Sequence, residues 1–341
     1  MSIAICIPTY NRFDELKNCL NSIYIAYLQY TKIKLEICIS DNSETNKNLN
    51  TINYFREKFK KKIIIKYHKF NTNQGVAKNY LRCISMSESE FVWTIGDDDL
   101  ITYDSLKTIS KLLKKKHIDY FFINSYLLRS DIVKNKKLID TRKLPKKMEP
   151  FSKIKKDKEV NFFELIDPKV SYDFLMAIFF SLFRKKKWDE NIRILDKKKI
   201  RDKKWLSNFE NSCFNQIVFV EAFRFSKAYF QSKPLSINTS GSRDWRIMYD
   251  FLEIVRFPEI LGYYRKKGLG FFRYLYCKNY SLRNFTNFFF KIYLYRNKNS
   301  GWQYVNFYKH ILVNIFYPNS IMSIFYFLLR RINKLLLTFI K

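Results

Sequence analysis

The sequence predicts an α/β protein with a mostly parallel sheet flanked by helices. Over the first 130 of its 341 residues, short β-rich runs alternate with helix-periodic segments, which is typical of a parallel sheet. Hydrophobic residues make up 47% of the chain and Gly and Pro contribute only 7 each, which excludes collagen-like, linker-like and disordered classes. The length exceeds what one core usually organises, so we expect a large domain with an appendage, or two domains.

Five short apolar runs are the predicted strands, and the segments between them are the predicted helices. The strands are 3–7, 35–40, 63–68, 91–95 and 120–126. Two of the intervening segments carry an apolar stripe at the spacing of one helix face. The first stripe is Leu16, Cys19, Leu20, Ile23 and Tyr27, and the second is Leu106, Ile109, Leu112 and Leu113.

Beyond residue 130 the pattern changes. Residues 130–169 are Lys-rich and contain three prolines, so we expect a long loop region there. A helix with apolar residues at four-residue steps from Trp205 to Ile217 follows, and then a short strand near 234–237. From about Phe251 the chain is aromatic, basic and helical. We therefore predict one domain over 1–250, with halves 1–130 and 131–250, and a helical basic C-terminal region over 251–341.

The chain carries 63 Lys+Arg against 31 Asp+Glu, a formal net charge of +32. A lysine-rich, solvated surface explains this charge without any function. Alternatively, the aromatic and basic stretch 263–341 draws the protein to an anionic membrane, at about 1 kcal/mol per basic residue near the lipid. The apolar face of an interfacial helix would then be Phe325, Leu328, Leu329, Ile332, Leu335 and Leu336. Basic residues interrupt 321–340, so this segment suits lying on a membrane better than crossing it.

The six cysteines show no CxxC spacing, so neither a zinc site nor a disulfide scaffold is expected. No charged n-region of a signal peptide precedes the strand at 3–7. These features predict a reducing, cytoplasmic compartment. Together with the basic tail, they predict a protein that is peripheral on the inner face of the cell membrane.

Three successive carboxylates, Asp97, Asp98 and Asp99, follow the strand 91–95 and Gly96. Ligands bind at the carboxyl ends of parallel strands, and a hard divalent cation would neutralise such a cluster. The alternative is an acidic turn that caps the helix starting near Asp104, although a cap needs only one acid. We therefore predict a Mg²⁺ or Mn²⁺ site that bridges to phosphate oxygens.

Three further segments lie at strand ends that a parallel sheet would place on the same edge. The first strand passes at Pro8 into a polar loop, and the second ends at Asp41 and Asn42. The third leads through 71–74 to Gly75 and Lys78 at a helix start, where a backbone and a lysine can meet a phosphate. Taken singly, the first two are more often ordinary turns, and the third is equally explained as a solvated turn with a surface lysine.

As a set, these four segments resemble the nucleotide-diphospho-sugar transferases of glycosyltransferase family 2, which have the GT-A fold, a Rossmann-like sheet. The resemblance covers the N-terminal 130 residues. It implies that Asp97 and Asp99 form the metal-binding DxD pair, with Asp99 as the direct ligand and Asp97 and Asp98 on the ribose or on metal-bound water. It also implies that the nucleotide sugar is bound by Pro8, Thr9, Tyr10, Arg12, Asp41, Asn73, Gly75, Lys78, Asp97 and Asp98.

Within this set, the resemblance places Pro8, Thr9 and Tyr10 against the base and Asp41 at its edge. Trp93, with Trp188 after residues 171–187, makes the chain most similar to the abequosyltransferase-type branch, which builds bacterial surface polysaccharides. Family members invert the anomeric centre, and a carboxylate takes the proton from the acceptor hydroxyl. The usual Glu-Asp pair that supplies this base is absent, and Lys78 stands where an arginine is commoner.

Glu210 is the expected catalytic base, together with the metal ligand Asp99 in the catalytic set. Asp202, Asp189 and Asp244 are the alternatives, and a solvated helix face explains Glu210 without a role. The predicted activity is metal-dependent transfer of a sugar to a hydroxyl of lipopolysaccharide, lipooligosaccharide or capsule. Two competing hypotheses are a nucleic-acid-binding basic protein and an inactive nucleotide-sugar-binding homologue. The first leaves the acidic cluster unexplained, so we expect no nucleic-acid partner.

Overall fold

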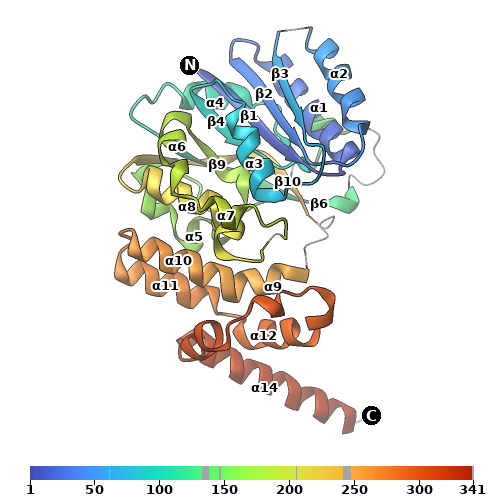
Figure 1. Cartoon of the computed structure of the whole chain (residues 1–341). Helices are drawn as coiled ribbons and strands as arrows, with labels where there is room; N and C mark the ends of the chain where they lie inside the picture. Colours follow the sequence, from blue (N-terminus) through green and yellow to red (C-terminus); the bar gives the residue numbers. More distant parts are fainter. Residues whose placement is uncertain (61, 133–137, 146, 205, 241–246, 340–341) are drawn as a thin grey trace. The chain divides into compact units, whose positions relative to one another are not determined.

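The computed structural model describes residues 1–60, 62–132, 138–145, 147–204, 206–240 and 247–339 (Figure 1). The chain divides into two compact units. The sheet unit comprises Met1–Trp205 and Phe214–Ser242, and the helical unit comprises Leu206–Cys213 and Arg243–Lys341. Compactness does not define a functional domain, so the division at residue 250 stays a prediction.

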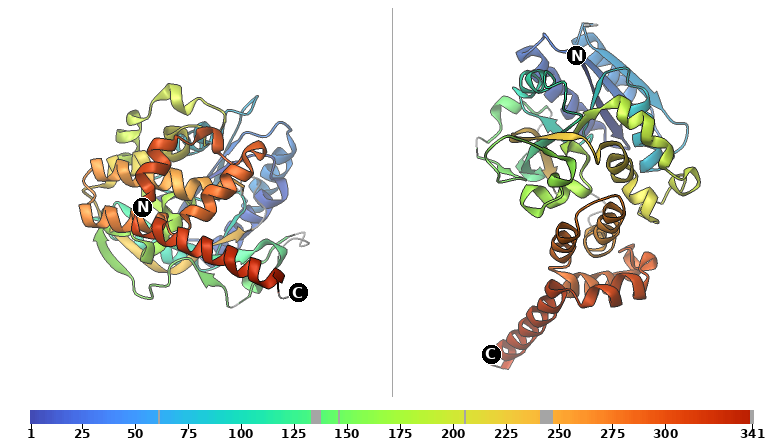
Figure 2. Two further views of the ribbon diagram at one scale, coloured as in Figure 1. Left: turned by 90° about the horizontal axis from the view of Figure 1, so that it is seen from below. Right: turned by 90° about the vertical axis from the view of Figure 1, so that its left-hand side faces the viewer.

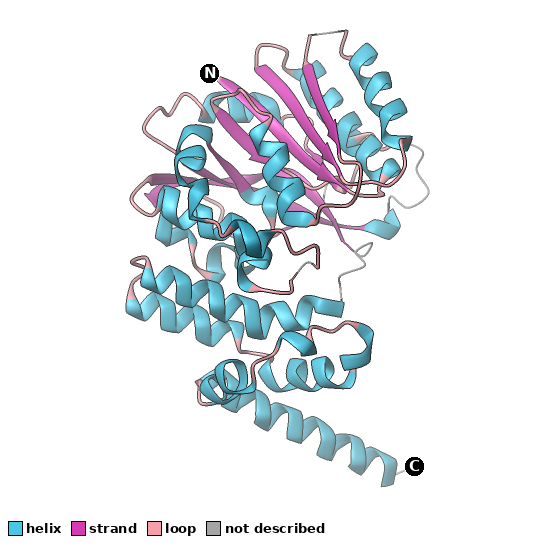
Figure 3. Ribbon diagram, in the orientation of Figure 1, coloured by secondary structure: helices cyan, strands magenta, loops and turns pink. Residues whose placement is uncertain are grey.

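Within the described residues, ten strands form one sheet in the order β3-β2-β1-β4-β9-β6-β10-β5, with β7 beside β6 and β8 beside β10 (Figure 3). They are β1 Ser2–Thr9, β2 Lys34–Asp41, β3 Ile64–Lys69, β4 Phe91–Thr94, β5 Asp99–Ile101, β6 Tyr120–Arg129, β7 Glu149–Pro150, β8 Lys158–Asn161, β9 Ser181–Arg184 and β10 Lys227–Ser240. The three longest pairings, β1 with β2, β2 with β3 and β6 with β10, are parallel. The predicted α/β class and its five early strands are thus confirmed.

The helices of the sheet unit are α1 Phe13–Gln29, α2 Lys47–Lys58, α3 Val76–Ser85, α4 Ser105–Leu112, α5 Pro168–Ser171, α6 Lys185–Asn191 and α7 Lys197–Ile200. Both predicted apolar stripes are buried, the first on α1 and the second on α4 and the residue after it. Helix α8, Phe209–Phe223, kinks at Cys213, where φ is −122° and ψ is 22°. The two compact units divide at this kink.

The expectation of a long loop over 130–169 is wrong in part. The segment contains the short strands β7 and β8, which pair antiparallel with β6 and β10. The partner residues of β8 lie about 70 positions later in the chain, so local sequence carried no sign of the pairing. Strand β9 also inserts between β4 and β6, and pairs antiparallel with both.

The helical unit contains α9 Tyr249–Phe251, α10 Phe257–Lys266, α11 Phe271–Ser281, α12 Phe285–Leu294, α13 Val313–Ile315 and α14 Pro318–Phe339, with π-helical turns at Leu252–Arg256 and Phe307–Leu312. Helices α10 and α11 lie side by side, and α14 packs on α12 and continues past it to the C-terminus (Figure 2). The predicted helical C-terminal region is confirmed. All six cysteines of the chain are buried and free.

A buried charge cluster joins the helices of this unit. Glu259 pairs with Arg256 at 2.5 Å, with His310 at 3.1 Å and with Lys309. Burial by itself would raise the pKa of Glu259, but the hydrogen bond with His310 and the charges of Arg256 and Lys309 outweigh it and lower the pKa to about 2. The cluster therefore ties α10 to the segment that follows residue 306.

We predict that Glu259→Gln lowers the free energy of unfolding by about 3 kcal/mol at neutral pH, since the pKa falls from 4.5 to about 2 and each pKa unit is worth about 1.4 kcal/mol. The folded-state pKa lies below the unfolded value of 4.5, so this stabilisation is present above about pH 4.5 and is lost as the pH falls towards about 2. Urea unfolding near pH 7 and near pH 3 measures the difference. A Glu57→Gln variant, exposed on α2, is the control. An equal loss at both pH values would contradict the prediction.

Candidate functional site

The carboxyl ends of four neighbouring parallel strands form one edge of the sheet. Thr9, the last residue of β1, lies beside Asp41, the last residue of β2, which lies beside Lys69 at the end of β3. Strand β4 pairs with β1 on its other side and ends beside Cys6. The loops that follow these strands therefore gather at one place, as the parallel topology predicts.

The loop after β4 carries three nearly buried carboxylates, with exposed fractions of 6% for Asp97, 7% for Asp98 and 1% for Asp99. The hydroxyl of Thr9 donates to Asp97 Oδ2 at 2.7 Å. Arg12 Nη1 lies 3.0 Å from Asp98 Oδ2 and 3.6 Å from Asp97 Oδ1. The structure thus brings the predicted residues Thr9 and Arg12 together with the acidic cluster.

Burial and a neighbouring carboxylate change the ionisation of Asp97. Burial, followed by the charge of Asp98, raises the pKa of Asp97 to about 7, although Arg12, Thr9 and the Tyr10 N–H act in the opposite direction. Arg12 therefore offsets only part of the effect that burial and Asp98 have on the pKa of Asp97. A ligand that brings a cation would be stabilised here.

Gly96 makes the tight turn of this loop possible. Its N–H donates to Asp99 Oδ2 at 2.7 Å. A Cβ at this position would lie 2.7 Å from Asp98 Oδ1 and 2.9 Å from Asp99 Oδ2. Any side chain would displace both carboxylates, which explains a glycine directly before them.

Asp41 is fully buried and organises the loop after β2. Its Oδ1 accepts from the Ser43 N–H at 2.7 Å, and its Oδ2 accepts from Asn48 at 2.9 Å and from the Tyr67 hydroxyl at 2.8 Å. Burial and the hydrogen bond to Asp41 raise the pKa of Tyr67, so this hydroxyl stays protonated as a donor. The carboxylate thereby shapes the loop, and its contact with a nucleotide base stays a prediction.

Asn42 connects three of the strand-end loops. Its backbone N–H donates to Thr9 O at 3.0 Å, and its side chain donates to Gly75 O at 3.0 Å and accepts from the Gln74 N–H at 3.2 Å. Asn79 of α3 adds a second bond to Thr9 O at 3.0 Å. These amides hold the edges of the site, a role that the sequence patterns did not assign to them.

Gly75 precedes α3 with φ +83°, a conformation that favours glycine. Asn73 Oδ1 accepts from its N–H at 2.8 Å and so shapes the turn. A Cβ here would lie 3.2 Å from the Cα of Lys203, so the segment around Asp202 packs closely on this loop. Lys78 is exposed on the first turn of α3 and donates to Gln74 at 2.7 Å.

The residues predicted to contact the nucleotide base differ in solvent exposure. Tyr10 is exposed and Pro8 is half-buried, so both are accessible at the rim of the strand-end edge. Asn11, which lies between Tyr10 and Arg12 in the sequence, adopts φ +53°. Its N–H donates to Ser43 Oγ at 2.8 Å. The first two strand-end loops are therefore bonded to each other.

Two residues of β10 complete the site and were missed by the sequence analysis. Asn238 donates to Asp99 Oδ1 at 2.6 Å, and the Thr239 hydroxyl donates to the Asp98 carbonyl at 2.7 Å. They arrive because β10 pairs antiparallel with β5, which places Asn238 beside Asp99. The predicted strand near 234–237 ended directly before Asn238, whereas β10 continues to Ser240. An Asn-Thr pair by itself does not indicate a functional site.

The carboxylates predicted as candidates for the catalytic base lie in different parts of the fold. Asp202 belongs to the sheet unit and its backbone lies against Gly75, whereas Glu210 begins α8 in the helical unit. Asp189 on α6 pairs with Lys185, and α6 follows the end of β9 that lies beside Phe91, the first residue of β4. Asp189 is thus at the opposite end of β4 from the acidic cluster. Asp244 lies outside the described residues.

The carboxylates suit a hard divalent cation by chemistry. Mg²⁺ and Mn²⁺ prefer oxygen donors, and Mg²⁺ is commonly held by one or two carboxylates with substrate phosphates. Asp97 and Asp99 supply two, and the pKa of Asp97 is raised by burial and then by the charge of Asp98, of which a cation would offset the second. Across the parts of the chain that the structure describes, no group of three or more His, Cys, Asp and Glu side chains is arranged for a metal. Substrate phosphate oxygens and water are the further ligands that such a cation commonly takes.

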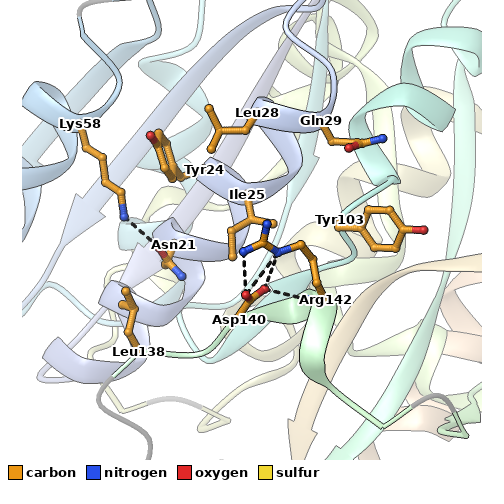
Figure 4. Close-up of a pocket in the computed structure, with 10 residues that line it drawn as sticks. All are labelled: Asn21, Tyr24, Ile25, Leu28, Gln29, Lys58, Tyr103, Leu138, Asp140 and Arg142. Carbon is orange, nitrogen blue, oxygen red and sulfur yellow. Dashed lines mark hydrogen bonds and ion pairs between the residues drawn. The ribbon is translucent and has the colours of Figure 1, made fainter.

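A separate cavity of about 490 Å³ lies beside α1 in the sheet unit (Figure 4). Its wall includes Lys58, which bonds Asn21 at 3.1 Å, and Arg142, which pairs with Asp140 at 2.7 Å. It contains none of the predicted site residues. We assign it no role in the chemistry of the acidic cluster.

We predict that Asn238→Leu lowers the free energy of unfolding by about 1–3 kcal/mol, because it removes a donor from the buried Asp99 carboxylate while keeping a similar volume. Urea unfolding measures the change. The control is Asn53→Leu, an exposed position on α2, which is expected to change stability by less than about 0.5 kcal/mol. Equal effects of the two substitutions would contradict a structural role of Asn238 at the site.

Curated proteins similar to this chain match part of it. Abequosyltransferase RfbV of Salmonella typhimurium is 35% identical over 113 residues, which is 33% of this chain and 33% of that protein. The poly(ribitol-phosphate) beta-N-acetylglucosaminyltransferase TarS of Staphylococcus aureus is 27% identical over 124 residues, 36% of this chain and 21% of TarS. The chain therefore matches a third or less of the length of these relatives.

Solved structures share the fold over most of the chain. TarS 1–349 of Staphylococcus aureus in complex with UDP-GlcNAc has a TM-score of 0.56 at 17% identity and covers 95% of this chain and 79% of its own. The mannosyltransferase PcManGT from Pyrobaculum calidifontis, in complex with GDP-Man and Mn²⁺, has a TM-score of 0.51 at 12% identity, with coverage of 94% and 82%. At such identities the likeness concerns the fold alone, and it confirms the expected GT-A architecture.

The family match concerns the same strands and loops that build the site. Residues 4–193, more than half of the chain, match the family model described as Glycosyl transferase family 2. The matched range contains β1, β2 and β4, whose carboxyl ends carry the acidic cluster and its partners. The chain belongs to glycosyl transferase family 2.

Proposed function

We propose that this protein is a metal-dependent, inverting glycosyltransferase. It moves a sugar from a nucleotide-diphospho-sugar donor to a hydroxyl of a bacterial cell-surface glycan, such as lipopolysaccharide, lipooligosaccharide or capsule. The observation that carries the proposal is the buried cluster Asp97–Asp99, at the carboxyl edge of a parallel sheet and beside two loops able to hold a nucleotide. Both curated relatives described above are named as sugar transferases, which supports the reaction class.

The donor would lie along the strand-end edge. Tyr10 and Pro8 are accessible for contact with a base, and the Lys78 amine can reach a phosphate from the start of α3. Solved relatives of the same fold bind UDP-GlcNAc or GDP-Man. Because those bases differ, the fold does not select one base, and the nucleotide has to be identified by experiment.

A divalent cation held by Asp97 and Asp99 would neutralise the diphosphate as it leaves. The chain's own residues prepare this position. Thr9, Gly96 and Asn238 orient the two carboxylates through hydrogen bonds of 2.6–2.7 Å, and Arg12 offsets part of the charge before the donor binds. This arrangement limits the reorganisation that donor binding requires.

Inversion needs one carboxylate on the acceptor side. In a direct displacement, the acceptor oxygen attacks the anomeric carbon, its proton passes to the base, and the bond to the nucleoside diphosphate breaks. Glu210 is our candidate for this base, at the start of α8. Asp202 is the alternative, because its segment packs on Gly75 of the predicted donor loop.

The donor site is tested by thermal unfolding with UDP, GDP, CDP and dTDP, each with and without Mn²⁺. A ligand at about 100 times its Kd stabilises by about 2.7 kcal/mol, so one nucleotide should raise Tm by several degrees in the presence of Mn²⁺. The rise should vanish in Asp99→Asn and persist in Asp131→Asn, an exposed carboxylate paired with Arg129. No rise with any nucleotide would overturn the proposal.

The base is tested once the donor and an acceptor are known. Glu210→Gln should lower kcat by about 10²- to 10⁴-fold and leave the nucleotide-induced Tm shift unchanged, since the base does not bind the donor. Asp202→Asn and Asp189→Asn serve as comparisons in the same assay. A full rate in Glu210→Gln with a loss in Asp202→Asn would transfer the role to Asp202.

A further inference from the structure

Two consecutive segments of the helical unit present apolar side chains to solvent. No single helix in the described part of the chain is long and apolar enough to cross a membrane. The pair Phe307–Ile315 and Pro318–Asn333, bent by 85°, is the exception when its two arms are taken together. Length and composition do not decide what these arms contact, but the identity of their buried and exposed side chains does bear on it.

The second arm, which belongs to α14, packs with its polar residues. Ser320 and Ser323 are buried, and the Ser323 hydroxyl lies 2.7 Å from that of Thr286 on α12. Phe327 also faces α12, where it stacks on Phe290 with ring centroids 4.8 Å apart. The exposed large apolar residues of this arm are Ile321, Met322, Phe325, Tyr326, Leu328, Leu329 and Ile332.

The first arm buries two polar residues beside one apolar residue, Ile311. His310 and Asn314 are buried, with His310 on Glu259 at 3.1 Å and Asn314 donating to the His310 carbonyl at 2.9 Å. Its exposed apolar residues are Phe307, Tyr308, Leu312 and Val313, and Phe316 directly after it is 77% exposed. In a helix that faces water, the apolar stripe normally points inward and the polar side outward.

The twelve exposed apolar side chains of these two arms and of Phe316 between them form what we name the 307–332 apolar face. Four of the six residues expected from the sequence, Phe325, Leu328, Leu329 and Ile332, are among them. Leu335 and Leu336 lie outside the described side chains. The first arm was not anticipated. A concentration of large exposed apolar side chains is typical of a contact with another molecule or a membrane.

The surrounding charge indicates the kind of partner. Residues 260–341 contain no Asp or Glu, and they contain fourteen Lys and Arg. Arg330 and Arg331 are exposed on α14 within the last turns of the apolar face, where long side chains can extend towards phosphate groups. A partner that is apolar inside and anionic at its surface matches both properties.

We propose that the 307–332 apolar face docks on an anionic lipid bilayer. The two bent arms lie in the interface with their apolar side chains among the acyl chains, and the basic residues contact the lipid headgroups. This docking is independent of the sugar-transfer chemistry. If the proposed function also holds, docking brings the enzyme to lipid-linked glycan acceptors at the inner face of the membrane.

The test is co-sedimentation of the full chain with vesicles of phosphatidylglycerol and phosphatidylcholine, compared with phosphatidylcholine alone, at physiological salt. We expect binding to the anionic vesicles, and weaker binding as salt rises. The variant Phe316→Ser/Phe325→Ser/Leu329→Ser should reduce vesicle partitioning at least about tenfold. The matched control is Phe225→Ser, which alters a 91% exposed phenylalanine of the sheet unit and should bind as the wild type does.

Three outcomes would overturn the proposal. One is no binding to anionic vesicles, and the second is equal binding of the triple variant with an unchanged thermal unfolding profile. The third is a stable dimer that the triple variant dissociates, because the face would then be covered by a second copy. Binding to oligonucleotides in the absence of vesicle binding would indicate that the basic residues contact nucleic acid and not lipid headgroups. The nucleotide-induced Tm shift is measured separately, so failure of docking and failure of the proposed function are distinguishable.

Discussion

Everything at the candidate site depends on the confinement of three carboxylates in one nearly buried turn. Carboxylates in neighbouring positions of one turn repel each other, and burial removes the water that would screen their charges. Each carboxylate therefore needs a specific partner. Thr9, Arg12, the Gly96 N–H and Asn238 provide those partners. The partners come from three separate stretches of chain, so a correctly assembled sheet is required before the acidic turn becomes tolerable.

The neighbouring loops are built on the same principle of internal hydrogen bonding. Asp41 and Asn42 bond backbone groups of their own loop and of the loops that follow β1 and β3. The side chains that remain at the rim, Tyr10 and Lys78, are exposed and therefore available to a ligand. A rigid edge with an accessible rim is the arrangement that favours binding with little reorganisation. Asp41, whose contact with the nucleotide base stays a prediction, has a structural role that its position at a strand end did not reveal.

The helical unit differs from the site in how its apolar and polar residues are distributed between interior and surface. Its interior combines buried apolar residues, such as Leu261 and Phe285, with polar and ionic contacts such as the Glu259 cluster, while many large apolar residues of the two arms point outward. The hydrophobic effect disfavours this distribution in water, so the outward face is best explained by a partner that removes it from water. The absence of acidic residues after Glu259 in the sequence makes a negatively charged surface the natural choice.

Local periodicity and short motifs were enough to predict the parallel strands, the two apolar helix stripes, the acidic turn and the family. They also indicated the basic helical C-terminal region. The folded structure was needed to show that β9 inserts between β4 and β6, that β7 and β8 join the sheet, and that β10 brings Asn238 and Thr239 to the acidic turn. It also showed which side of α14 is exposed. These features depend on pairings between residues dozens to more than a hundred positions apart, for which local propensity carries no information.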